Sequence, residues 1–247
     1  MKETDSYVGT CGWQHPQWRR TFFPTGMSAE ERLAYYASRL RAVELDASRS
    51  MPTAEQSALW RASVPDDFRF TVRAPRALTH KGHLRNPEQL LTALFRAIAP
   101  LEEQLGVILF ELPTRWPRMT DRLASFLAAL PGDRHYAFEF PDPDWHHQEV
   151  YDLLTRHGAA FCIHDGGGPA PPEALTASFV YARLGGPGAV PGERYGAAAL
   201  RGWATRIANW QRKGYGVYTF FANVERGFAV KDACLLQSYL RGDAGCS

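Results

Sequence analysis

Short apolar segments that end on a charged or amide residue recur along the whole chain, and they constrain the fold more than any other feature. The segments are 42–46, 68–73, 106–111, 136–139, 160–165, 179–183 and 217–223. Strands buried on both faces read as continuous apolar runs, which is the pattern of a parallel sheet. If all these strands run in one direction, their polar ends meet at one rim.

The number and spacing of the elements predict an α/β fold of the (β/α)₈ TIM-type barrel class. Eight alternating units fit into 247 residues, which is close to the usual length of one such barrel. We expect a single domain over 1–242 and a flexible tail over 243–247. The Gly- and Pro-rich stretch 166–172 predicts a reduced sixth helix. An open doubly wound sheet is the alternative, disfavoured because no Gly-x-Gly-x-x-Gly follows the first strand.

Helix-start signals and hydrophobic runs define the expected elements. Ser28 with Glu31 and Thr53 with Gln56 have the spacing of capping boxes, and Pro87 takes the favoured first position of a helix. The expected strands are 7–11, 42–46, 68–73, 107–112, 135–140, 160–164, 179–184 and 216–221. The expected helices are 28–41, 53–63, 86–104, 120–130, 146–157, 197–213 and 229–240.

Composition limits the partners and the compartment. A net charge of +2 argues against a dedicated nucleic-acid binder with a strongly basic face, although it leaves room for a local patch. No stretch approaches the ~20 apolar residues of a membrane span, so we expect no membrane partner. Four widely spaced cysteines without a Cys-x-x-Cys pair suit a reducing environment, and we expect a cytoplasmic protein.

Glu111 and Glu139 are the candidate catalytic residues. They end neighbouring strands, whose axes lie ~4.8 Å apart, so their carboxyl groups fit the ~5–10 Å window of glycoside hydrolases. Repulsion between two close carboxylates would raise the pKa of one and provide an acid beside a base. In the alternative reading, each carboxylate pairs with Arg73 or Arg183 and both stay ionised in a structural role.

A hard divalent cation such as Mg²⁺ or Mn²⁺ is a possible cofactor. Glu44, Asp165 and His164 are the candidate metal ligands at strand ends, and His80 is a further nitrogen donor. No dense ligand motif such as His-Glu-x-x-His occurs. A histidine at a strand end is more often a satisfied hydrogen-bonding residue than a ligand.

A third set of rim residues is expected to bind substrate. Arg73 and Arg183 would anchor an anionic group, and aromatic side chains would stack on a sugar or a base. An equally good interpretation makes the aromatic residues the core of a lid over one end of the barrel. The set comprises Arg73, Arg183, Trp13, Trp18, Trp145 and Asn223.

Several short motifs resemble the domain of unknown function 72 (YecE-like) family, over nearly the whole chain and in order. They are Gly9-Thr10-Cys11-Gly12-Trp13, Leu109-Phe110-Glu111-Leu112-Pro113, Phe138-Glu139-Phe140 and Tyr181-Ala182-Arg183-Leu184. The chain is identified as a divergent member. The resemblance implies a TIM-type barrel, but the family has no established activity and therefore implies no reaction.

Departures from the family pattern concentrate at the rim. The resemblance implies Ser where Cys11 stands, Lys at Arg73 and Gln at Glu111. Acidic residues are gained at Asp46, Glu111 and Asp142, so this rim is more acidic than the family's. Such a pocket favours a cation, a metal or an amine-bearing ligand, or else it reflects the loss of the ancestral chemistry.

Three functions follow from these expectations. The leading hypothesis is a hydrolase-like enzyme that uses acid/base or divalent-metal-assisted chemistry on a small-molecule ligand at the C-terminal face of the barrel. A nucleic-acid-binding or repair-nuclease-like barrel is possible but not favoured. The third is a catalytically silent ligand-binding protein. The substrate and the oligomeric state stay open.

Overall fold

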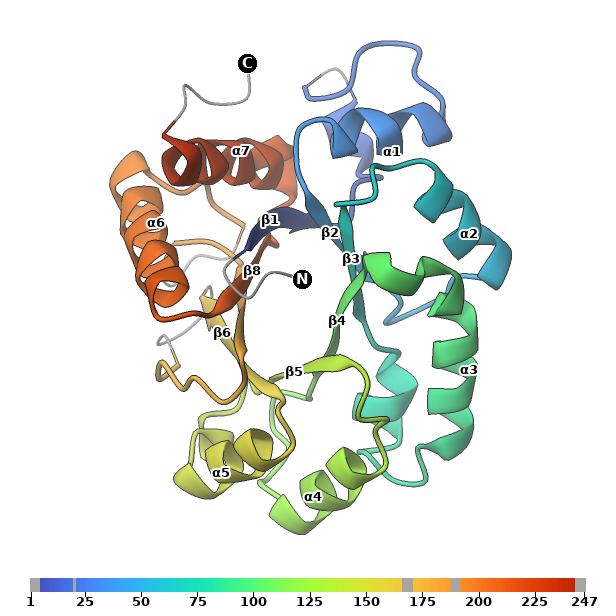
Figure 1. Cartoon of the computed structure of the whole chain (residues 1–247), viewed down its shortest axis with the longest axis vertical. Coiled ribbons are helices and arrows are strands. Elements are labelled where there is room, and N and C mark those ends of the chain that lie inside the picture. The colour runs from blue at the N-terminus through green and yellow to red at the C-terminus, as the bar shows by residue number, and fades with distance from the viewer. Residues whose placement is uncertain (1–4, 20, 166–170, 188–191, 243–247) are drawn as a thin grey trace.

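Eight parallel strands form the inner wall of the molecule and close into a barrel in chain order, with β8 paired to β1 (Figure 1). The computed structural model describes residues 5–19, 21–165, 171–187 and 192–242. The strands are β1 (Ser6–Cys11), β2 (Ala42–Asp46), β3 (Arg69–Arg73), β4 (Leu105–Glu111), β5 (His135–Glu139), β6 (Ala160–Asp165), β7 (Phe179–Leu184) and β8 (Gly216–Phe221). The predicted TIM-type barrel is confirmed.

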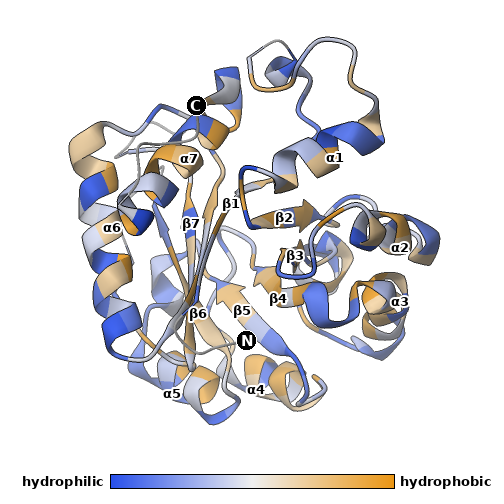
Figure 2. Cartoon of the chain, turned by 45° about the horizontal axis from the view of Figure 1, so that its top comes forward, coloured by the Kyte–Doolittle hydropathy of each residue, from blue (hydrophilic) through white to orange (hydrophobic). Residues whose placement is uncertain are grey.

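Helices surround the strands on the outside (Figure 1). They are α1 (Ala29–Ala37), α2 (Ala54–Ala62), α3 (Glu88–Ile98), α4 (Thr120–Ala128), α5 (Gln148–Arg156), α6 (Ala197–Arg212) and α7 (Phe228–Arg241). Each carries both hydrophilic and hydrophobic residues, as expected for helices with one face on a core (Figure 2). No helix in the described part of the chain is long and apolar enough to cross a bilayer.

The predicted capping boxes are present at the starts of α1 and α2. Ser28 Oγ accepts from the Glu31 amide while the Glu31 carboxylate accepts from the Ser28 amide, and Thr53 and Gln56 exchange the same two bonds. The expected helix 86–104 is wrong in one respect. It divides into α3 and a 3₁₀ segment, Ala99–Gln104, because Pro100 lacks the amide that would continue the α-helical bonding.

The sixth crossover carries no helix in its described part, residues 171–178, which agrees with the predicted reduction. The remainder of that stretch, 166–170, and the expected tail, 243–247, lie outside the described residues. The helix that follows β7 is therefore α6.

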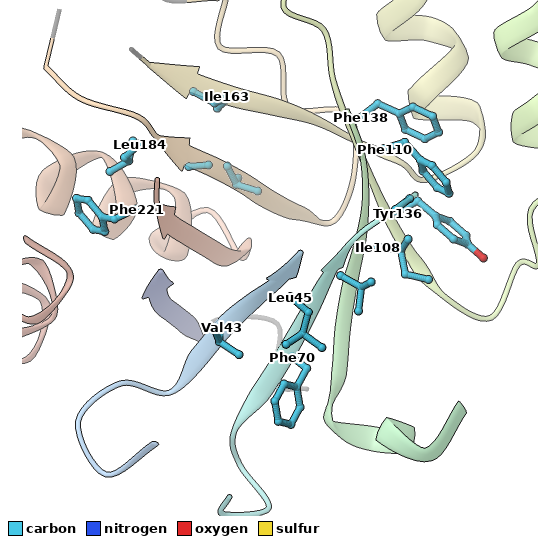
Figure 3. Close-up of a cluster of buried hydrophobic side chains, with 14 of the residues drawn as sticks. Val43, Leu45, Phe70, Ile108, Phe110, Tyr136, Phe138, Ile163, Leu184 and Phe221 are labelled. Atoms are coloured by element: carbon cyan, nitrogen blue, oxygen red, sulfur yellow. The ribbon is translucent and has the colours of Figure 1, made fainter. Parts of the chain in front are cut away.

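Alternation along the strands separates two apolar layers. Side chains of one parity point outward and pack against the helices (Figure 3). This outer layer includes Val43, Leu45, Phe70, Ile108, Phe110, Tyr136, Phe138, Ile163, Leu184 and Phe221. The other parity fills the lumen with residues such as Leu109, Cys162, Tyr181 and Phe220. The barrel is thus a packed core whose polar groups collect at the ends of the strands.

Close packing inside the barrel requires glycine at position 106 on β4. A Cβ atom at this position would lie 2.9 Å from the ring of Tyr218 and 3.4 Å from the Thr71 side chain. Glycine at position 106 therefore leaves room for the Tyr218 ring inside the barrel.

Candidate functional site

The strand register places charged side chains next to one another at the C-terminal rim. Glu111 on β4 is the register partner of Glu139 on β5, and Asp46 on β2 is the partner of Arg73 on β3. These residues share the lumen-facing parity of their strands. The predicted convergence of Glu111 and Glu139 is therefore a direct result of two adjacent parallel strands in register.

Arg183 of β7 lies at the centre of this cluster. Its Nη1 atom is 2.5 Å from Glu139 Oε2 and 3.3 Å from Glu111 Oε2, and its Nε atom is 3.1 Å from Glu44 Oε2. The side chain is only 11% exposed. A guanidinium buried to this degree requires paired carboxylates, and three of them surround it. We call Glu44, Glu111, Glu139, Arg73 and Arg183 the rim cluster.

Glu44 is the innermost carboxylate of the rim cluster, with a side chain that is 1% exposed. The Tyr181 hydroxyl donates a 2.7 Å hydrogen bond to its Oε2 atom, and that hydroxyl also shares a 3.2 Å hydrogen bond with Thr71 Oγ1. Tyr181 entered the sequence analysis only as part of a family motif, without a role in the site. The available signal was its position two residues before Arg183, which puts both on the lumen face of β7.

Arg73 is the member of the rim cluster that also contacts Asp46, at the mouth of the barrel. Its guanidinium contacts Glu111 Oε2 at 2.8 Å and Asp46 Oδ2 at 2.7 Å. Burial opposes ionisation of Glu111, but Arg183 and Arg73 outweigh that effect and lower its pKa. Glu111 is therefore not the carboxyl of the pair whose pKa is raised, because guanidinium groups stand beside it.

The proposed metal ligands do not assemble. Asp165 has the opposite parity to its neighbour His164 and accepts a hydrogen bond from the Tyr195 hydroxyl on the outer side of the barrel, away from Glu44. His164 faces the lumen beside Arg183 in register, and its Nε2 atom has no hydrogen-bond partner within the described residues. No three His, Cys, Asp or Glu side chains group as metal ligands in the described part of the chain.

The three tryptophans predicted to bind substrate are buried. Trp13 is 5% exposed and packs edge-on against Trp60, while Trp18 and Trp145 are fully buried. The indole of Trp18 donates to the Val224 carbonyl, and that of Trp145 donates to the Trp116 carbonyl. Their placement agrees with the alternative interpretation, a lid core that anchors the loops.

Asn223 is also a structural residue, because its amide donates to Asp232 Oδ2 and to the Glu193 carbonyl from a fully buried position. It ties the end of β8 to α7 and to the loop before α6. Its place at the end of a strand does not bring it into the rim cluster.

His80 is a further titratable group near the rim cluster. It lies on a single-turn π-helix, Ala77–Lys81, which follows β3; such turns occur frequently at functional sites. Burial and the Arg76 charge lower its pKa, although Glu111 opposes this change. A lowered pKa keeps the imidazole neutral near pH 7, the form that can accept a proton.

The fold and the cluster define a class of protein. It is a TIM-type barrel whose ionisable groups gather at the C-terminal ends of its strands, where barrels of this class build their sites. More specifically, the chain belongs to the family described as protein of unknown function DUF72, whose model matches residues 7–245.

Relatives and solved structures agree with this family. The UPF0759 protein YecE of Escherichia coli K12 is 31% identical over 141 residues, which are 56% of this chain and 49% of that protein; the matched region thus spans about half of the relative. A DUF72 family protein from Thermotoga maritima superposes with a TM-score of 0.84 at 25% identity, covering 96% of this chain and 98% of the other.

A more distant structure shares the fold alone. The glycoside hydrolase family 5 enzyme PbGH5A of Prevotella bryantii has a TM-score of 0.56 at 10% identity, with 97% of each chain covered. This similarity supports the barrel architecture and carries no information on chemistry.

Proposed function

We propose that the chain is a hydrolytic enzyme whose active site is the rim cluster, with Glu111 and Glu139 as the carboxylates that handle protons. The contact of both carboxylates with one nitrogen atom of Arg183 carries this proposal. Two oxygens that share Nη1 lie no more than about 6 Å apart, a limit that admits the ~5–5.5 Å of retaining glycosidases and excludes the longest separations of inverting ones. A pair at this separation suits nucleophilic attack at one carboxylate and proton transfer at the other.

The surroundings of the two glutamates favour different roles. Glu111 is the more exposed, at 26% of its side chain, and its lowered pKa keeps it ionised at neutral pH. We assign it as the nucleophile or as the group that stabilises positive charge in the transition state. Glu139, at 11% exposure, lies deeper beside Arg183 and is assigned to proton transfer. His80 provides a neutral imidazole on the same side of the rim.

The charge balance of the site indicates what it binds. Among the described residues, four carboxylates form ion pairs with two guanidinium groups: Glu44, Asp46, Glu111 and Glu139 contact Arg73 and Arg183. Ionised carboxylates accept hydrogen bonds and attract positive charge. We infer that the reacting part of the ligand carries hydroxyl or amine donors.

Turnover of chromogenic substrates tests the assignment. A panel of p-nitrophenyl glycosides, p-nitrophenyl esters and bis(p-nitrophenyl) phosphate separates the reaction classes by one optical signal. We expect one class to be hydrolysed, and Glu139→Gln and Glu111→Gln to slow that reaction by at least about a hundredfold, the scale of general acid–base catalysis. Glu103→Gln, an exposed glutamate outside the site, is the matched control. Equal turnover in all three variants would contradict the proposal.

The second candidate function is that of a catalytically silent ligand-binding protein, and the ion pairs of the rim cluster favour it. Arg183 already forms ion pairs with all three glutamates that surround it, so the rim cluster can hold a fixed shape beneath a bound molecule. Binding of a small amine or polyol, detected by a shift in melting temperature without conversion of any panel substrate, would favour this function over hydrolysis.

A further inference from the structure

Four consecutive loops at the C-terminal rim contain no acidic residue. They are the loops that follow β1, β2, β3 and β4, at 12–28, 47–53, 74–87 and 112–119. All four contain arginine, and together their described residues present six exposed cations: Arg19, Arg49, Arg76, Lys81, Arg85 and Arg115. We call these six residues the basic crescent.

The cations of the basic crescent are available to an external partner. None of the six forms an ion pair with a carboxylate among the residues that the structure describes. Arg73, at the end of β3, differs in this respect, since it is bound to Asp46 and Glu111. Within the part of the chain that the structure describes, the rim thus has an inner cluster of ion-paired side chains and an outer set of cations without a carboxylate partner.

The loops of the basic crescent are neighbours in space as well as in sequence. They follow adjacent strands of the closed barrel, and β2, β3 and β4 lie side by side in Figure 1. The Arg76 amide donates to the Ser48 carbonyl at 3.0 Å, which joins the second loop to the third. The π-helix and the left-handed backbone of Leu84 and Asn86 define the shape of the third loop.

The opposite half of the rim has a different character. The loops after β5, β7 and β8 mix both signs of charge, since their described residues expose Asp144, Glu193 and Glu225 alongside Arg194 and Arg226. The whole chain carries a net charge of +2, so the chain without the six crescent charges carries −4. This separation of charge gives the molecule a basic side that a polyanion would recognise.

We propose that the basic crescent binds the phosphate backbone of double-stranded nucleic acid. Six unpaired Arg and Lys side chains spread over four loops match a row of phosphates better than they match a single small anion. Binding of a single strand relies on exposed aromatic rings that stack on bases. Here Trp13, Trp18 and Trp116 are buried, so contact through the backbone of a duplex is favoured.

Fluorescence anisotropy with a labelled DNA duplex of about 24 base pairs tests this surface on the full chain, with an RNA duplex and a single strand of the same sequence as further probes. If all six cations contact phosphates, the slope of log K against log salt is about −5. The variant Arg49→Gln/Arg76→Gln/Lys81→Gln should reduce that slope to about −3 and weaken binding at about 50 mM salt by at least tenfold.

A matched control removes three charges from the other end of the barrel. Arg96, Arg156 and Lys213 are exposed at or just past the C-terminal ends of α3, α5 and α6, which a barrel of this topology places at the face opposite the rim. Their triple glutamine variant should bind like the unmodified chain. Absence of duplex binding at low salt, equal weakening by both triple variants, or tighter binding of the single strand would each overturn the proposal. Because binding is measured without turnover, failure here leaves the hydrolase assignment intact.

Discussion

The hydroxyl of Tyr181 donates a hydrogen bond of 2.7 Å to Oε2 of Glu44, a carboxylate that is buried almost completely. The same oxygen lies 3.1 Å from Arg183 Nε, so the tyrosine stabilises the innermost ion pair of the rim cluster. A hydrogen bond to a charged group contributes about 1.5–3 kcal/mol. We therefore expect Tyr181→Phe to lower the free energy of unfolding by about that amount at pH 7, as measured by urea denaturation.

Tyr136→Phe is the matched control for this prediction. The Tyr136 hydroxyl donates to the neutral carbonyl of Pro131 at 3.0 Å, and its loss should cost only about 0.5–1.5 kcal/mol. Equal costs for the two variants would show that the charge of Glu44 does not strengthen the Tyr181 bond.

Arg183 should be more important for stability than any other charged residue of the rim cluster. Arg183→Met leaves Glu44, Glu111 and Glu139 without their shared partner, and removal of one side of a buried ion pair costs about 3–5 kcal/mol. The loss should shrink as the pH falls, because protonation relieves the unpaired carboxylates. Urea denaturation at pH 7 and pH 5 measures both effects.

Arg73→Met tests whether burial causes the effect of Arg183. Arg73 is 22% exposed, and its partner Asp46 is 47% exposed, so solvent screens this pair. We expect a smaller loss of stability than for Arg183→Met. A loss as large as that of Arg183→Met would mean that the central position of Arg183 is not what matters.

Alternation along the strands explains how much of the site the sequence could predict. Glu111, Glu139 and Arg183 meet because each ends a buried strand on the lumen-facing parity, which a period of two makes visible. The same alternation separates Asp165 from the lumen-facing residues with which the sequence analysis grouped it. It lies one residue beyond His164, so its side chain points to the opposite side of the barrel wall.

Loop residues were harder to place than strand residues. Trp18 and Trp145 lie in loops at the rim, and their sequence positions suit a stacking surface as well as a buried anchor. The choice depends on packing: each indole finds a carbonyl from a distant segment, Val224 for Trp18 and Trp116 for Trp145. Such contacts carry no periodicity that a single sequence reveals.

Two carboxylates should give opposite pH dependences of stability. The pKa of Glu111 is lowered by folding, so its contribution is present above the unfolded value of about 4.3 and is lost as the pH falls. The pKa of Asp165 is raised by burial, so its contribution is present below the unfolded value of about 3.9 and is lost as the pH rises through the folded value.

Urea denaturation of Glu111→Gln and Asp165→Asn across the acidic range checks these signs. The stability deficit of Glu111→Gln should be largest at neutral pH and shrink towards acid. Asp165→Asn should improve relative to the unmodified chain as the pH rises, since asparagine can still accept the hydrogen bond from Tyr195. Parallel changes in the two variants would contradict the opposite shifts.

Cys11 stands at the mouth of the barrel beside Arg183, where a nucleophilic thiol could act, but its surroundings oppose ionisation. Burial, with the Glu44 charge beside it, raises the thiol pKa, and the Arg183 guanidinium 3.7 Å from the sulfur only partly offsets this. Since the thiolate is the reactive form, iodoacetamide should alkylate Cys11 much more slowly in the native chain than in urea at pH 8. Mass spectrometry of the Cys11 peptide measures both rates. Comparable rates would make Cys11 a candidate nucleophile, whereas slow native labelling would agree with the assignment of the chemistry to the carboxylates of the rim cluster.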